Sequence, residues 1–310
     1  MKWRAYTLFS TYSIVARDSE TGQLGVAVQT HQMCVGAVVP WLAPGIGAIA
    51  TQSLTNISFG PIGLAMLKAG VPAPKVIEAL VASDENAQVR QVAAVDAAGR
   101  VGAWTGPGCI PEASHHLGDG YSVQANMMTA PSVVLAMADA YEHAQGDLAQ
   151  RMLAALEAAQ AEGGDIRGMQ SAALKVVDGK LNPAWPYVYD LRVDEHEEPV
   201  RELARLVRLR HAQLIEQQGY EALEQGNRER ALSLWAAARA EAPELEELAF
   251  WQAVTLADDA GDAQTGADLL RPVLRNDPRR EHWLDLIARL QQCGLIKRSG
   301  AGDELLGLLR

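Results

Sequence analysis

Alternating and clustered apolar positions in the first two thirds of the chain predict a series of β-strands. Residues 11–16 alternate polar and apolar side chains, a turn with Gly22 follows, and residues 24–30 return as a second strand. The same reading predicts strands at residues 36–41, 46–52, 91–95, 100–104, 121–127, 171–177 and 188–193. Short turns separate most of these strands, which favours antiparallel pairing.

Helical periodicity appears between the strand pairs. Apolar residues at helical spacing predict helices at 61–69, 74–82, 132–143 and 148–161. The uninterrupted apolar runs at 35–39 and 46–50 suggest strands that are buried on both faces. Two packed sheets between two helical layers, a four-layer αββα sandwich in the α+β class, would satisfy this order of elements.

A change in composition near residue 195 predicts two domains. Residues 1–195 hold 19 of the 27 glycines, whereas residues 196–310 hold 35 of the 65 charged residues in a shorter segment. Glycine-turned strands followed by charged helices would produce this contrast. The acidic segment ending at Pro199 forms the expected hinge, so the predicted domains are 1–195 and 196–310.

The second predicted domain contains an internal repeat of 35 residues. Residues 226–231 recur at 261–266, Leu234 recurs as Leu269, and Pro243 recurs as Pro278. This all-α pattern resembles the tetratricopeptide repeat over roughly residues 212–295. We expect Trp235, Trp251 and Trp283 in its core. The repeat would bind a protein or peptide, mediate self-association, or simply pack on the first domain.

Charge and cysteine content exclude several classes of protein. The formal net charge is −11, and the absence of a basic run argues against nucleic-acid and membrane-surface partners. The first residues carry too short an apolar segment for a secretory signal, which leads us to expect a cytoplasmic protein. Three widely spaced cysteines argue against a disulfide framework and a zinc site, and we expect no metal or cofactor.

Six blocks of the first domain resemble a known bacterial family. The blocks read TYSIVA from residue 11, GVAVQTH from 25, GAVVPW from 36, ATQS from 50, GDGYSVQANM from 118 and GGDIRGMQSAA from 163. They are similar to the family of unknown function 1028, which is assigned to the N-terminal-nucleophile (Ntn) hydrolase superfamily. The resemblance spans roughly residues 10–195 and implies the same αββα architecture, as in proteasome β subunits.

The resemblance implies a catalytic set centred on Thr11. In this superfamily an N-terminal residue supplies the nucleophile, and its own α-amine accepts the hydroxyl proton. Asn126 is then expected to stabilise the oxyanion, while Asp165 and Ser171 would orient the α-amine. No lysine lies between Lys2 and Lys68, so His31 is the expected substitute for the lysine of proteasome-type sites. The predicted substrate-binding residues are Gln52, Ser53, Thr105, Gln124, Arg167 and Gln170.

Thr11 is an internal residue of this sequence. The proposed chemistry therefore requires cleavage between Ser10 and Thr11, or a different start of the chain. Cys109 followed by His115 and His116 is a second, weaker candidate for a nucleophile pair or half of a metal site, and Cys34 is expected in the core.

Three functional hypotheses follow from these observations. The first is an amidohydrolase that cleaves a small amide or short peptide bond through an acyl-enzyme at Thr11. The second is a catalytically inactive Ntn-fold protein that serves as a binding or assembly module. The third is a helical-repeat scaffold that the first domain merely supports. In each case we expect a homo-oligomer.

Overall fold

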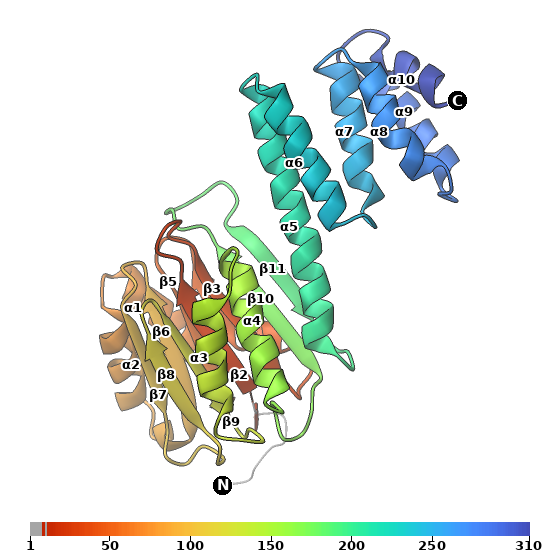
Figure 1. The fold of residues 1–310 in the computed structure, drawn as a ribbon. Coiled ribbons are helices and arrows are strands. Elements are labelled where there is room, and N and C mark those ends of the chain that lie inside the picture. The colour runs from red at the N-terminus through yellow and green to blue at the C-terminus, as the bar shows by residue number, and fades with distance from the viewer. Residues whose placement is uncertain (1–7, 10) are drawn as a thin grey trace. The chain divides into compact units, whose positions relative to one another are not determined.

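The computed structural model describes residues 8, 9 and 11–310, which form two antiparallel sheets followed by a run of helices (Figure 1). Contacts divide the chain into two compact units, the first ending at Val207 and the second beginning at Arg208. The division falls within one long helix, α5 (Pro199–Glu224). The predicted boundary at residue 195 lies just before this helix.

The first unit is built around a six-stranded and a five-stranded sheet. The six-stranded sheet has the order β11-β10-β3-β2-β9-β8, and the other has the order β1-β5-β6-β7 with β4 also paired to β5. The strands are β1 (Leu8–Phe9), β2 (Thr11–Arg17), β3 (Leu24–Thr30), β4 (Pro40–Ala43), β5 (Gly47–Leu54), β6 (Arg90–Asp96), β7 (Val101–Thr105), β8 (Ser114–Gly118), β9 (Tyr121–Asn126), β10 (Ser171–Val177) and β11 (Tyr187–Val193).

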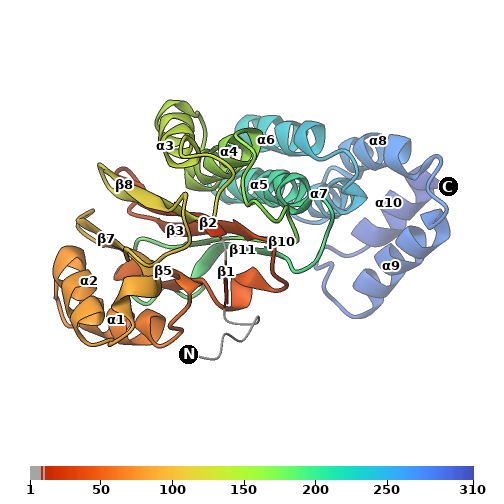
Figure 2. The ribbon, with the colours of Figure 1, turned by 90° about the horizontal axis from the view of Figure 1, so that it is seen from below.

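Two pairs of helices cover the outer faces of the sheets. Helices α1 (Phe59–Lys68) and α2 (Ala73–Ala82) pack on the five-stranded sheet, and α3 (Val133–His143) and α4 (Leu148–Ala161) pack on the six-stranded sheet. Figure 2 shows the two pairs on opposite sides of the sheets. Gly60 allows α1 to approach β4 closely, because a Cβ atom there would lie 2.2 Å from the ring of Trp41.

The inner faces of the two sheets form a core, and one part of this core is apolar. Val15, Val26 and Val28 of the six-stranded sheet pack there with Ala50 and Val95 of the other sheet. The alternating pattern of residues 11–16 places Thr11, Ser13 and Val15 on this inner face. Tyr12 points the other way, because its hydroxyl donates to Gln160 of α4 at 3.0 Å.

The strand predicted at residues 36–41 is wrong for residues 36–39 and correct for Pro40 and Trp41. Residues Val35–Ala37 form a short 3₁₀ helix, and the strand begins only at Pro40. Cys34 initiates this turn with a left-handed backbone (φ 63°), and the Ser171 hydroxyl accepts a hydrogen bond from the Val35 N–H at 3.1 Å. Val35 and Val39 are buried as in a strand, so burial alone does not specify the backbone conformation. Cys34 itself is half-buried, contrary to its expected place in the core.

The sequence pattern did not reveal β8. This strand has the sequence Ser-His-His-Leu-Gly, lies at the edge of the six-stranded sheet, and is mostly exposed or half-buried. An edge strand pairs with one neighbouring strand, and packing constrains only one of its faces. It therefore needs neither a regular alternation nor strong β-propensity.

The second unit contains the helices that follow α5. They are α6 (Arg228–Glu241), α7 (Glu246–Asp258), α8 (Ala263–Leu274), α9 (Arg280–Gln292) and α10 (Ala301–Leu309). The 35-residue spacing is visible in their first turns. Gly226 and Gly261 both have positive φ, and the next residues, Asn227 and Asp262, each cap a helix through a side-chain oxygen.

Three tryptophans were expected in the core of this unit, and the prediction is wrong for Trp251. Trp235 is fully buried and its indole N–H donates to the Glu216 carbonyl at 3.2 Å, and Trp283 packs partly buried against the core. Trp251 is 36% exposed and lies beside the buried Phe250. Adjacent residues on α7 face different directions, so one of the two rings must leave the interior.

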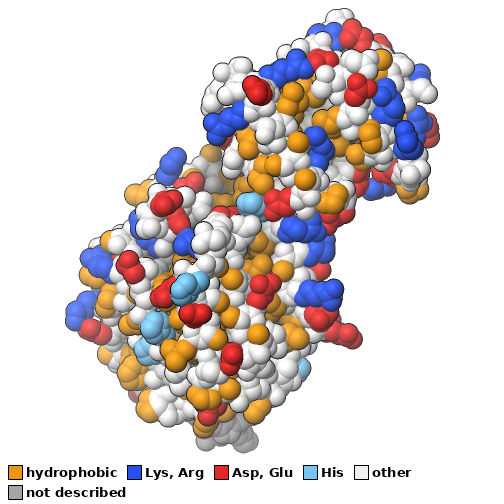
Figure 3. Space-filling view, in the orientation of Figure 1, with side chains coloured by type: hydrophobic (Ala, Val, Ile, Leu, Met, Phe, Trp, Pro, Cys, Tyr) orange, Lys and Arg blue, Asp and Glu red, His pale blue; other side chains and the backbone are white. Residues whose placement is uncertain are grey.

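None of the helices among the described residues is long and apolar enough to cross a membrane. On the face drawn in Figure 3, acidic and basic side chains are interspersed.

Two of the tryptophans of the second unit, Trp235 and Trp251, provide a matched stability test. We expect Trp235→Ala to lower the free energy of unfolding by about 3–5 kcal/mol, because it leaves a cavity beside Tyr220. Trp251→Ala should cost less than about 1 kcal/mol. Urea denaturation of the full chain, followed by circular dichroism, measures both. Equal effects of the two substitutions would contradict the burial described here.

Candidate functional site

A row of polar side chains crosses the six-stranded sheet at one end of the inner face. Thr11 is paired in register with Asn126 on one side and with Thr30 on the other, and Thr30 is paired with Ser171. Residues paired directly across antiparallel strands point to the same face of a sheet. All four are at most 1% exposed. The row therefore brings together Thr11, Asn126 and Ser171, which the sequence placed in one site.

A second polar row faces the first from the five-stranded sheet. Gln52 of β5 is paired in register with Gln91 of β6, which is paired with Thr105 of β7. Gln52 and Gln91 are fully buried. Side-chain bonds join the two sheets here, because the Ser13 hydroxyl donates to Gln52 Oε1 at 2.6 Å. Two of the predicted substrate-binding residues, Gln52 and Thr105, thus lie in this row.

The two rows are joined by one chain of hydrogen bonds that runs in a single direction. From Ser122 to Gln91 each member donates to the next at distances between 2.6 and 2.9 Å, and the Thr105 hydroxyl then lies 2.9 Å from His115 Nδ1. The order is Ser122, Gln124, Ser13, Gln52, Gln91, Thr105 and His115. A hydroxyl has one proton, so this consistent direction fixes where each hydroxyl and amide points.

Thr11 is held by the middle of this network. Its carbonyl oxygen accepts from Gln52 Nε2 at 3.2 Å and from Asn126 Nδ2 at 3.4 Å, and its hydroxyl donates to Thr30 Oγ1 at 3.4 Å. Asn126 also donates to Gln91 Oε1 at 2.9 Å. Asn126 thus directs its amide at Thr11 itself and at the network.

Asp165 joins two loops next to the polar row. Its buried carboxylate accepts from the backbone N–H of His31 at 3.0 Å and from the guanidinium of Arg167 at 2.9 Å. The ring of His31 lies 3.1 Å from the Met169 carbonyl through Nδ1, and the Gln170 N–H donates to the Thr30 carbonyl. Asp165, His31, Arg167 and Gln170 therefore form one cluster that fixes the end of β3 against the start of β10.

Ser171 also anchors a loop. Its hydroxyl donates to the Gln32 carbonyl and accepts from the Val35 N–H, so it holds the turn that follows His31. The predicted orienting role of Ser171 toward an amine at Thr11 would have to act across Thr30, which lies between them in register.

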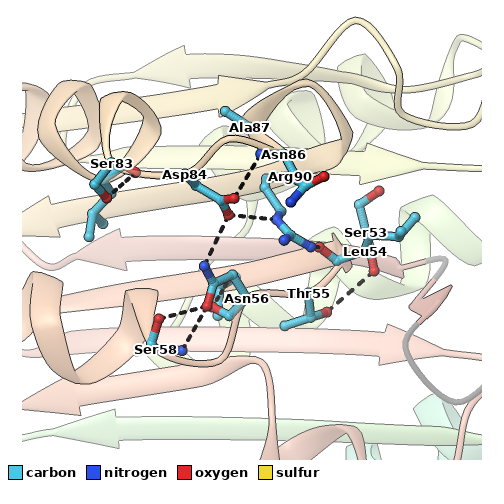
Figure 4. A network of polar contacts seen from close by, with 12 residues as sticks. Ser53, Leu54, Thr55, Asn56, Ser58, Ser83, Asp84, Asn86, Ala87 and Arg90 are labelled. Carbon is cyan, nitrogen blue, oxygen red and sulfur yellow. Dashed lines mark hydrogen bonds and ion pairs between the residues drawn. The ribbon is translucent and has the colours of Figure 1, made fainter. Parts of the chain in front are cut away.

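Charged groups at the adjoining end of the five-stranded sheet are engaged elsewhere. Arg90, paired in register with Ser53, donates to Asp84 at 2.8 Å and to the Leu54 carbonyl, and Asn56 completes the network (Figure 4). Burial alone would raise the pKa of Asp84, but the bonds from Arg90 and Asn56 hold that pKa below its usual value. On the six-stranded sheet, Lys175 lies four residues along β10 from Ser171 and pairs with Asp190 at 3.4 Å.

A cavity of about 440 Å³ lies beside the end of the hydrogen-bond chain at Thr105 and His115. Its lining also includes Cys109, Glu112 and Ser114. We call it the edge cavity. Burial raises the pKa of the Cys109 thiol, whose nearest partners are Ser53 and the Arg90 carbonyl. Burial and, secondarily, the neighbouring His116 lower the pKa of His115. Among the described residues, no group of three or more His, Cys, Asp or Glu side chains is placed to hold a metal ion.

Comparisons with known proteins identify the first unit. Residues 11–203 match the family described as "Family of unknown function (DUF1028)". The chain belongs to this family. A crystal structure of the DUF1028 protein SPO2555 from Silicibacter pomeroyi is similar at 29% identity and a TM-score of 0.58, covering 64% of this chain and 88% of that chain. No curated protein matches.

The family match contains every residue of the candidate site and none of the second unit. Sequence reasoning nominated Thr11, Gln52, Gln124, Asn126 and Thr105, which the structure connects through one network. It missed Ser13 and Gln91, and it considered His115 only as a partner of Cys109. The available signal was a polar residue at an inward position of an otherwise apolar strand, as in Arg-Gln-Val-Ala-Ala-Val at the start of β6.

Gln91 is the member of the network whose loss affects most partners. Gln91→Leu removes the acceptor for Gln52 and Asn126 and the donor to Thr105. Each buried group left unsatisfied costs about 1–3 kcal/mol, so we expect a loss of at least about 2 kcal/mol in unfolding free energy. Chemical denaturation of the full chain measures it. The exposed Gln88→Leu is the control and should change stability by less than about 0.5 kcal/mol.

Proposed function

We propose that this DUF1028 protein is an Ntn-type amidohydrolase that uses Thr11 as its nucleophile. The observation that carries the proposal is the register of the polar row, which sets Thr11 between Asn126 and Thr30 on an inner sheet face. Two antiparallel sheets with helices on both outer faces agree with the αββα sandwich of Ntn hydrolases. The substrate would be a small amide or a short peptide.

The mechanism requires a free α-amine at Thr11. Such an amine has a reference pKa of about 7.7–8.0 and can accept the Thr11 hydroxyl proton as the hydroxyl attacks the amide carbonyl. The C–N bond then breaks, the leaving amine takes the proton, and water hydrolyses the acyl-enzyme. Asn126 Nδ2 and Gln52 Nε2 are the nearest amide donors for the developing oxyanion, and substrate would have to replace one of their present partners.

Cleavage between Ser10 and Thr11 would create that amine. Ser10 lies outside the described residues, but its neighbours pair in different sheets: Phe9 is opposite Ser53 in one, and Thr11 is opposite Asn126 in the other.

A second candidate is a catalytically inactive Ntn fold that serves as a binding or assembly module. The specific observation in its favour is that Thr11 is completely buried in the intact chain and its carbonyl is fully engaged. In this case the second unit, as a tetratricopeptide-like repeat, would bind a protein or a second copy of the chain. The exposed Trp251 is available for such a contact.

Intact-mass measurement of the purified protein distinguishes the two candidates. We expect a species that lacks residues 1–10 and that hydrolyses small amides. Thr11→Ala should abolish this activity with an unchanged circular dichroism spectrum, and Thr11→Ser should retain part of it because the hydroxyl remains. A chain that keeps residues 1–10 and is inert to hydroxyl-directed electrophiles would favour the binding module.

A further inference from the structure

The edge cavity lies beyond the Thr11 site on the same sheet. His115 of β8 and Ser13 of β2 are both paired in register with Gln124 of β9, so β8 is two strands from β2. Neighbouring strands are about 4.8 Å apart, which puts the cavity about 10 Å from β2. His115 shares the inward face with Gln124 and Ser13. His116 faces the opposite way, toward the ring of Tyr121 at 6.3 Å.

The hydrogen-bond chain favours one tautomer of His115. The Thr105 hydroxyl accepts from Gln91 Nε2 at 2.9 Å, so its own proton is free to go to His115 Nδ1, also at 2.9 Å. Gln91 cannot be turned around, because its oxygen accepts from both Gln52 and Asn126. With the Thr105 proton directed at Nδ1, the favoured form of His115 is the neutral imidazole with its proton on Nε2.

The Nε2–H is a donor without a partner in the described part of the chain, on a residue that lines the cavity. The burial that lowers the pKa of His115 favours the same neutral form. Such a half-buried donor can bond the oxygen of a ligand that enters the cavity.

The charges around the cavity select the type of oxygen. Its lining includes the carboxylate of Glu112 at the exposed rim and the thiol of Cys109, but no lysine or arginine. An anionic carboxylate would meet a like charge and no cation, whereas a neutral carboxamide brings an oxygen for His115 and N–H groups for Glu112.

We propose that the edge cavity binds the neutral carboxamide group of a small molecule, with His115 Nε2–H donating to the carbonyl oxygen and Glu112 accepting from the amide N–H. Gln91 is a positioning residue, because it does not line the cavity and acts on the ligand only through Thr105 and His115. The site does not depend on a free amine at Thr11 and therefore stands apart from the proposed hydrolase activity.

The proposal is tested by NMR on protein with ¹⁵N-labelled histidine rings. In the free protein His115 should be the Nε2–H tautomer, and Thr105→Val should remove that preference because the donor to Nδ1 is lost. Titration with N-acetylglycinamide should then shift the His115 signals in a saturable way. N-acetylglycine, the matched carboxylate, should bind at least 10-fold more weakly.

Two neighbouring histidines supply the controls. His115→Gln should weaken binding of N-acetylglycinamide at least 10-fold, while His116→Gln should leave it unchanged. Thr11→Ala should also bind normally, and this variant separates the present proposal from the proposed amidase. Equal binding of the carboxylate, an Nδ1–H tautomer of His115, or full binding by a folded His115→Gln variant would overturn the proposal.

Discussion

The polar part of the interface between the two sheets is stable only because its buried amides and hydroxyls are hydrogen-bonded to one another. An unpaired amide in an apolar interior costs several kcal/mol, and this structure buries Gln52, Gln91 and Gln124 between two sheets. They are tolerated because each donates to the next member and accepts from the previous one. A network of this kind allows few alternative arrangements, so it fixes the position of one sheet relative to the other.

One residue links the two regions that we associate with function. Gln91 accepts from Gln52 and Asn126, which hold the Thr11 carbonyl, and it donates to Thr105, which contacts His115. The oxygen and the nitrogen of one amide group thus act, through these neighbours, on the backbone of Thr11 and on the imidazole of His115. The cluster of Asp165, His31 and Arg167 has a different task, since it joins the loops at the ends of β3 and β10.

Strand and helix order could be predicted from the sequence, but pairing between sheets could not. Alternation identified β2 and β3, yet the burial of Val35 and Val39 was mistaken for a strand because periodicity reports environment and not backbone shape. Asn126 and Thr11 were nominated through a family resemblance. Gln91 was missed, and His115 was considered only beside Cys109, because only the register of β6 and β8 brings these residues to Gln52 and Gln124.

The proposed cleavage before Thr11 would leave the network intact. β1 pairs with β5 at only two positions, whereas the bonds to the Thr11 carbonyl come from Gln52 and Asn126, which are retained. In the proposed mechanism the new amine itself accepts the Thr11 hydroxyl proton, so the base belongs to the nucleophilic residue and no separate lysine is required to accept that proton.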